Sequence, residues 1–93
     1  MDIAIRHDEA NHRFVAEVGG QLAQLQYLER DRQTVVFHHT FVPPGMRGGG
    51  IAGSLVKHAL DWARSGGRMV IPVCPYVAAY MQKHPEYEDL LTR

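Results

Sequence analysis

The sequence predicts an α+β domain in which four strands are followed by a helix, a strand and a second helix. Three observations predict it. Apolar residues alternate with polar ones along much of residues 1–42, apolar residues recur at helical spacing over about 50–65, and a short apolar run at 68–73 precedes a proline that suits a helix start. The chain has 93 residues, so we expect one domain spanning 1–93.

The first three strands are predicted from alternation and from the turns between them. Ile3 and Ile5 define a short strand over residues 1–6, and two longer ones cover 13–18 and 21–30. The dipeptide Gly19-Gly20 between the longer strands is typical of a two-residue hairpin turn. Residues 31–33 form the next turn.

The strand at 34–42 is predicted to be central. Simple alternation places Val35, Phe37, His39 and Phe41 on one face, and Val36, His38 and Val42 on the other. Because apolar residues occur on both faces, we expect both to be covered.

The second half begins after Pro43-Pro44-Gly45. A helix is expected from about Gly50 to Ser65 and ends at Gly66-Gly67. A buried strand follows at 68–73, and Pro75 begins a helix that runs to about His84. We expect the remaining residues to form a polar tail.

Composition argues against several kinds of partner. Ten basic residues balance ten acidic ones and are mixed along the chain, whereas nucleic-acid binding usually needs a basic excess, so none is expected. No apolar run approaches the roughly 20 residues of a membrane span, and no membrane association is predicted. A lone cysteine forms no internal disulfide, which favours a reducing, cytoplasmic setting.

A glycine-rich loop joins the fourth strand to the first helix. Consecutive glycines let several backbone N–H groups approach one ligand, and the helix amino terminus adds partial positive charge. We therefore expect a pyrophosphate-binding loop, against the alternative of a ligand-free turn. Its residues are Arg47, Gly48, Gly49, Gly50, Ile51 and Ala52.

Two other phosphate motifs are excluded at this loop. Ile51 and Ala52 stand where a P-loop needs lysine and serine or threonine. A dinucleotide fingerprint belongs in the first strand–helix–strand unit and needs an acidic residue about 20 positions on. Here four strands precede the loop, and no acidic residue lies between Asp61 and Glu86.

Two side chains are candidates for catalysis. Cys74 precedes Pro75 at a helix start, where a thiol's pKa is lowered. It could accept the acyl group transiently as an acyl-cysteine, or hydrogen-bond a thioester without a covalent intermediate; the alternative is a small buried apolar residue. His39 could carry a proton near neutral pH, or could be a core histidine bonded to the backbone. The histidines show no metal-ligand spacing, and no metal site is predicted.

From about residue 39 to 90 the chain resembles the GNAT acetyltransferase superfamily, and specifically its minimal YjdJ-type N-acetyltransferase branch. Residues 47–52 fit the superfamily's loop, which reads Arg or Gln, two variable residues, Gly, one variable residue, then Gly or Ala. The other matching segments, in order, are His39-Thr40, Val42-Pro43, Val73-Cys74-Pro75-Tyr76, Tyr80 and His84-Pro85-Glu86-Tyr87.

The resemblance implies a compact GNAT-like fold, with a mixed, mainly antiparallel sheet of about five strands and two helices. It implies that the sheet opens between its fourth and fifth strands to take acetyl-CoA as co-substrate. The pantetheine arm would pair with main-chain groups near Phe41 and Val42, the pyrophosphate would rest on residues 47–52, and the thioester would lie beside Cys74. Tyr76 and Tyr80, four apart on the last helix, could flank the arm or could simply be core aromatics.

Two departures bear on the chemistry. The branch usually has Glu where this chain has Phe41, and larger relatives often have a catalytic Tyr where this chain has Met81. The leading hypothesis is an acetyl-CoA-dependent N-acetyltransferase acting on an amine acceptor, as a monomer or weak homodimer. The alternatives are a non-catalytic acyl-CoA-binding module and a ligand-free interaction domain.

Overall fold

The structure is a computed structural model that describes residues 4–46 and 50–91. Its element order confirms the predicted succession of four strands, helix, strand and helix. The strands are β1 (Ile5–Asp8), β2 (Arg13–Val18), β3 (Gln21–Asp31), β4 (Thr34–Phe41) and β5 (Met69–Pro72). The helices are α1 (Ile51–Ser65) and α2 (Pro75–Lys83), with short 3₁₀ turns η1 (Glu9–Asn11), η2 (Pro44–Met46) and η3 (Pro85–Leu90).

The strands form one mixed sheet in the order β1-β2-β3-β4-β5. The first four are antiparallel neighbours, and β5 pairs with β4 in parallel, across the helical connection that a parallel pair requires. The predicted hairpin turn is confirmed. Gly19 and Gly20 have φ of 59° and 80°, the two positive values of a type I′ turn.

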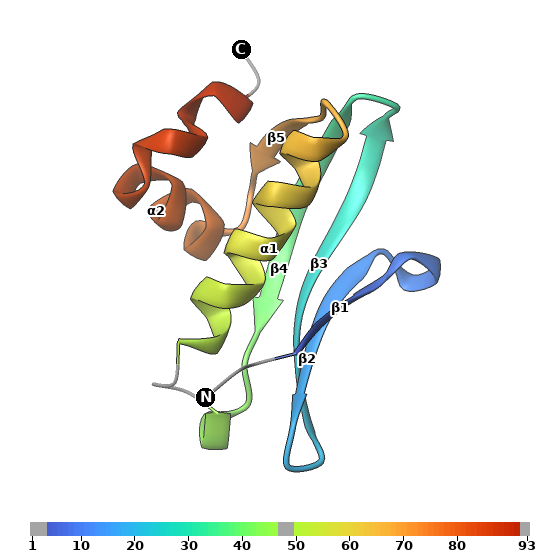
Figure 1. The fold of residues 1–93 in the computed structure, drawn as a ribbon, viewed down its shortest axis with the longest axis vertical. Helices are drawn as coiled ribbons and strands as arrows, with labels where there is room; N and C mark the ends of the chain where they lie inside the picture. The colour runs from blue at the N-terminus through green and yellow to red at the C-terminus, as the bar shows by residue number, and fades with distance from the viewer. Residues whose placement is uncertain (1–3, 47–49, 92–93) are drawn as a thin grey trace.

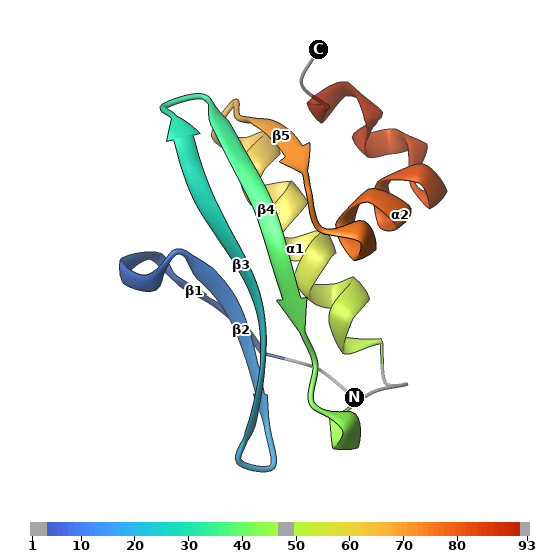
Figure 2. The same cartoon turned by 180° about the vertical axis from the view of Figure 1, so that it is seen from behind.

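One face of the sheet carries the core. α1 crosses this face and α2 lies beside β5, whereas no helix formed by the described residues covers the opposite face in either view (Figures 1 and 2). The apolar stripe of α1 packs against inward side chains of β2, β3 and β4. Fully buried members of this core are Phe14, Leu25, Val35, Phe37, Leu55, Val56, Leu60, Val70 and Val77.

The prediction that β4 is covered on both faces is wrong. Val35 and Phe37 are fully buried, but His38 and His39 are exposed and Phe41 keeps 42% of its surface exposed. On the open face, Leu28 is 47% exposed. Of the two apolar residues that suggested a second covering layer, Val36 lies beside Leu28 on the uncovered face, whereas Val42 packs against the core.

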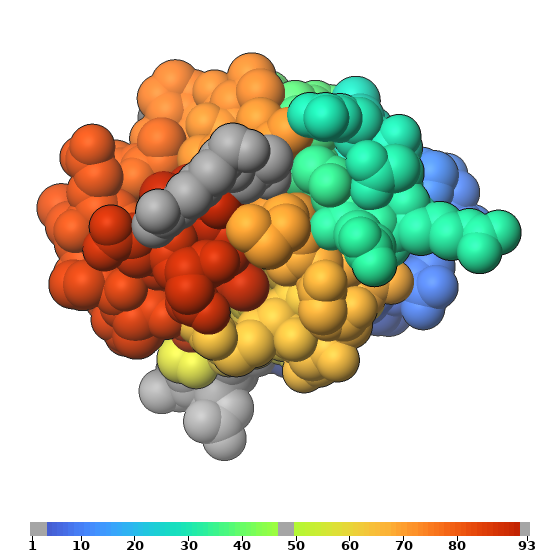
Figure 3. Space-filling view, turned by 90° about the horizontal axis from the view of Figure 1, so that it is seen from above, coloured from blue at the N-terminus to red at the C-terminus, as the bar shows by residue number. Residues whose placement is uncertain are grey.

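The expected polar tail is also wrong, because residues 85–90 fold against α1 (Figure 3). Tyr87 and Leu90 are three positions apart, which places them on one side of a 3₁₀ turn, and both are buried. The Tyr87 hydroxyl donates to the Asp61 carboxylate at 2.7 Å. Arg64 binds both carboxylate oxygens of Asp89 at 2.9 Å, so polar residues fasten this segment to the helix.

Candidate functional site

The parallel pairing of β4 and β5 stops halfway along β4. Its last registered pair is Phe37 with Pro72, and the Cys74 N–H then donates to the Phe37 carbonyl at 2.9 Å. Pro72 and Pro75 have no N–H to offer a neighbouring strand, and proline at the first helical position suits the start of α2. The chain therefore leaves the sheet at Cys74, while β4 continues to Phe41 in pairing with β3.

A β-bulge then reverses the alternation of β4. Tyr27 pairs with Phe37 but Gln26 pairs with His39, so His38 is an extra residue on β4. An inserted residue moves every later side chain to the other face of the sheet. Thr40, opposite the buried Leu25, therefore turns inward, and His39 and Phe41 turn outward.

This bulge corrects the predicted placement of His39. It does share a face with Phe41, but not with Phe37, and it is exposed rather than being a core histidine. Its neighbour in register on β3 is Gln26. The geometry of the strand does not bring the imidazole to Cys74, and its catalytic role stays a prediction.

Cys74 is buried, 6% exposed, at the start of α2. Its Sγ lies 3.3 Å from Oγ1 of Thr40. Burial by itself raises the pKa of the thiol. The Thr40 hydroxyl and the backbone N–H groups of Val77 and Tyr76 favour the thiolate more strongly, so the pKa of Cys74 lies below its ordinary value. The sulfur makes no capping hydrogen bond of normal geometry to the described helix, so we take Thr40 as its principal partner.

A cleft of about 490 Å³ opens where β4 and β5 have parted. It runs from the carboxyl end of β4 to the amino terminus of α1, with a rim on α2. Met46 and Ile51 are 6% and 7% exposed and supply apolar surface. The described residues that line it are Thr40, Phe41, Val42, Met46, Gly50, Ile51, Ala52 and Tyr76.

The amino terminus of α1 reaches this cleft through Gly50. Gly50 has φ of 75°, a left-handed conformation that side chains rarely adopt, and its carbonyl accepts the first helical bond from Ser54 at 3.0 Å. The first N–H groups of a helix have no partner within the helix and attract anions. Of the predicted pyrophosphate loop, Gly50, Ile51 and Ala52 line the cleft, while Arg47, Gly48 and Gly49 lie outside the described residues.

The two predicted tyrosines have different environments. Tyr76 is 44% exposed and lines the cleft. Tyr80 stacks on His84 with ring centroids 4.0 Å apart. Both side chains reach Gly53 on α1, where a Cβ would lie 3.8 Å from the Tyr76 hydroxyl oxygen and 3.8 Å from a ring carbon of Tyr80. Tyr76 is therefore placed to contact a ligand, and Tyr80 packs behind it against the helix.

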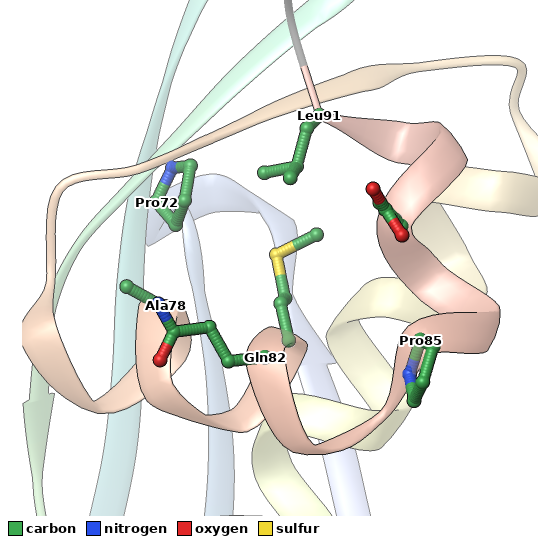
Figure 4. Close-up of a pocket in the computed structure, with 7 residues that line it drawn as sticks. Pro72, Ala78, Gln82, Pro85 and Leu91 are labelled. Carbon is green, nitrogen blue, oxygen red and sulfur yellow. The ribbon is translucent and has the colours of Figure 1, made fainter.

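A second cavity, of about 420 Å³, lies on the other side of α2 (Figure 4). Pro72 from the end of β5 faces Leu91 and the α2 residues Ala78 and Gln82 across it. Met81, the position at which larger relatives often have tyrosine, lines this cavity and is 4% exposed. Met81 is not among the described residues that line the cleft beside Cys74.

Three basic side chains of α1 and the turn that follows it are engaged in structural contacts. Lys57 pairs with Asp61 at 2.9 Å, and Arg64 with Asp89 at 2.9 Å. The Arg68 guanidinium lies 4.2 Å from the centre of the Trp62 ring. Among the described residues there is no cluster of histidine, cysteine and carboxylate groups able to hold a metal ion, and no helix has the length and hydropathy needed to cross a membrane.

Sequence reasoning missed two residues of this site. Simple alternation along residues 34–42 points Thr40 away from the core, so the sequence does not indicate it as a partner of Cys74. Met46 closes the apolar side of the cleft from within η2. The sequence contains no signal that predicts the bulge. Met46, in contrast, could have been singled out as a large apolar residue in the loop before the helix.

The fold of this chain is shared with a solved structure. The solution structure of a GCN5-like protein from Staphylococcus aureus superposes with a TM-score of 0.74, covering 96% of this chain and 87% of that one at 23% identity. The mixed sheet with its helices is therefore a GCN5-like fold. The predicted fold class is confirmed.

The chain belongs to the GCN5-related N-acetyltransferases, whose family sequence model matches residues 13–90. It is similar to Protein NATD1 of Xenopus tropicalis, with 32% identity over 85 residues that cover 89% of this chain and 78% of that protein. Human Protein NATD1 is also 32% identical over 85 residues, covering 89% and 75%. The superfamily prediction is confirmed, and the YjdJ-type branch stays a prediction.

Proposed function

We propose that this protein is an acetyl-CoA-dependent N-acetyltransferase that transfers the acetyl group to an amine. Membership of the family supports acetyltransferase activity. The observation that carries the proposal is the cleft itself, which extends from an anion-attracting helix terminus at Gly50 to Thr40, whose hydroxyl contacts the buried Cys74 thiol; Cys74 itself is not among the described lining residues. One end suits a diphosphate and the other suits thioester chemistry.

The cleft offers each part of acetyl-CoA a matching surface. The pyrophosphate would meet the N–H groups at the start of α1, together with the loop 47–49. The pantetheine arm would follow the β4 main chain near Phe41 and Val42, on the side from which β5 has departed. Met46 and Ile51 would contact its apolar segments, and the Tyr76 ring would cover it from α2.

In the proposed reaction the acceptor nitrogen attacks the thioester carbonyl carbon. A C–N bond forms, the C–S bond breaks, and the sulfur leaves as a thiolate. Cys74 donates its proton to that thiolate and regains one from the acetylated nitrogen through solvent, so one proton passes from nitrogen to sulfur overall. A thiol with a lowered pKa is a more effective proton donor than a free one.

A charge placed in the cleft tests the proposed site. Ala52→Glu puts a carboxylate where the pyrophosphate would bind, and we expect acetyl-CoA affinity, measured by calorimetry, to fall at least about tenfold. Ala79→Glu is the matched control because Ala79 is an exposed residue of α2 that lies outside the cleft lining. Equal loss in both variants, or no binding by the folded parent, would refute the proposed site.

A non-catalytic acyl-CoA-binding module is the second candidate. It is favoured by the apolar Phe41 at the cleft and by Met81 lying in a different cavity, since neither can move a proton. Acceptor-dependent release of CoA from acetyl-CoA with a panel of amines separates the two functions. Tight binding without release for any amine would favour the module.

A further inference from the structure

We propose that Thr40 is a positioning residue that orients the Cys74 thiol and stabilises its thiolate by donating a hydrogen bond to the sulfur. The proposal rests on the proposed function of the cleft, because Cys74 is assigned to the reaction there. The proposal adds Thr40 to that chemistry as a residue that acts through Cys74.

The contact comes from two elements that are far apart in sequence. Thr40 lies near the end of β4 and Cys74 begins α2, 34 positions later, with Oγ1 and Sγ 3.3 Å apart. That separation is normal for a hydrogen bond to sulfur, in which a hydroxyl donates to a thiolate, whereas a protonated thiol can donate in return. Thr40 also lines the cleft, so its side chain connects the ligand side of the site to the buried Cys74 thiol, which is not among the described lining residues.

Two features of the fold, the bulge in β4 and a backbone hydrogen bond, bring Thr40 and Cys74 into contact. Without the extra residue at His38, residue 40 would face outward and residue 39 would face the core side. The Cys74 N–H is held by the Phe37 carbonyl at 2.9 Å, which fixes the cysteine backbone to the residue just before the bulge. Backbone and side chain of Cys74 are thus both tied to β4, and the thiol has a defined direction.

The groups around the sulfur act mainly through burial and hydrogen bonding. Burial opposes ionisation, and the Thr40 hydroxyl is the largest single influence that favours it, ahead of either α2 backbone N–H group taken alone. Titratable side chains on the two flanking elements are His38 and His39 on β4, both exposed, and Tyr76, Tyr80 and the exposed Lys83 on α2. The exposed imidazoles lie in solvent, which screens their charge.

The test titrates the thiol directly. Cys74 is the only cysteine in the chain, so the rate of alkylation by iodoacetamide as a function of pH reports this one group. Thr40→Val removes the hydroxyl and retains the branched shape, and Thr40→Ser retains the hydroxyl. Thr34→Val is the matched control, since it removes a buried hydroxyl from the other end of β4.

We expect Thr40→Val to raise the apparent pKa of Cys74 by about one unit, which lowers the thiolate fraction and the alkylation rate at neutral pH about tenfold. Thr40→Ser should restore most of the rate, and Thr34→Val should titrate like the parent. In turnover, Thr40→Val should lower kcat with little change in acetyl-CoA affinity.

The thiol measurement uses neither acetyl-CoA nor an acceptor, so it can succeed even if the proposed enzymatic function fails. A Thr40→Val protein that melts like the parent and titrates like it would overturn the proposal. A Thr40→Ser protein with the same titration as Thr40→Val would also overturn it, because a purely structural role of the branched side chain predicts that result.

Discussion

The two ends of the sheet are built differently. Where β1 and β2 meet α1, rings pack densely: His7 stacks on Phe14 at 4.1 Å, and Trp62 contacts Phe14 edge-on at 5.4 Å. Tyr27 and Arg68 join them, the latter 4.2 Å above Trp62. Where β4 passes β5, the strands have parted, Phe41 and Tyr76 are partly exposed, and a cleft opens.

This difference assigns stability mainly to the aromatic end of the sheet and ligand binding to the cleft end. Buried aromatic rings contribute most per residue to a small core, since each removes a large apolar area from water. An end whose strands must part to admit a ligand cannot be filled in the same way. We infer that the aromatic end stabilises the fold and so allows the cleft end to keep exposed apolar surface.

Replacing one phenylalanine at each end of the sheet tests this division most directly. Phe14 is fully buried, and Phe14→Ala should lower the free energy of unfolding by about 3–5 kcal/mol. Phe41 is 42% exposed, so Phe41→Ala should cost less than about 1 kcal/mol while weakening acetyl-CoA binding. Urea unfolding and calorimetry measure the two quantities. Similar stability losses in both variants would contradict the division.

Cys74→Ala should affect turnover more than folding. A residue that supplies a proton in the transition state is worth about 10²–10⁴-fold in rate, and we expect kcat to fall by roughly 10²-fold. Acetyl-CoA affinity and the melting temperature should change little, because only a small side chain is removed. Unchanged turnover in Cys74→Ala would exclude both the proton-donor role and an obligatory acyl-cysteine intermediate.

The smallest effect concerns pH at the aromatic end. Burial lowers the pKa of His7 below 6.5, with Glu9 opposing and His58 and Arg68 adding to the shift. The Tyr27 hydroxyl, whose pKa burial raises to about 12, stays protonated and donates to Nε2 of neutral His7 at 2.6 Å. The unfolded chain therefore takes up a proton before the folded one does.

The stability of the parent should consequently fall as pH drops below about 6.5, and the loss should be complete once pH passes the folded pKa of His7. His7→Gln retains a polar side chain but cannot titrate. The unfolding free energy of the parent, measured relative to that of the variant, should therefore fall as pH drops across that window and stay constant outside it. Parallel pH profiles would show that His7 does not couple protonation to folding. The titration of Cys74 should be unaffected by the variant.

Much of the fold was predictable because it depends on local patterns. The order of strands and helices along the chain, the Gly19-Gly20 turn and the helix from Ile51 to Ser65 follow from alternation, glycine conformations and apolar spacing. The resemblance further predicted the parting of the last two strands. The failures came from contacts distant in sequence: Tyr87 is buried because Asp61 and α1 lie beside it, which no local pattern shows.

The sequence by itself therefore determined the elements, their order, the single cysteine and the glycine-rich entry to α1. Only the tertiary structure decided which side chains meet in the cleft. One extra residue at His38 turns Thr40 inward and His39 outward, and whether a strand has a bulge depends on its pairing with a neighbour, not on its own alternation. The partner of Cys74 was thus fixed by the register between β3 and β4, together with the point at which Pro72 and Pro75 let the chain leave the sheet.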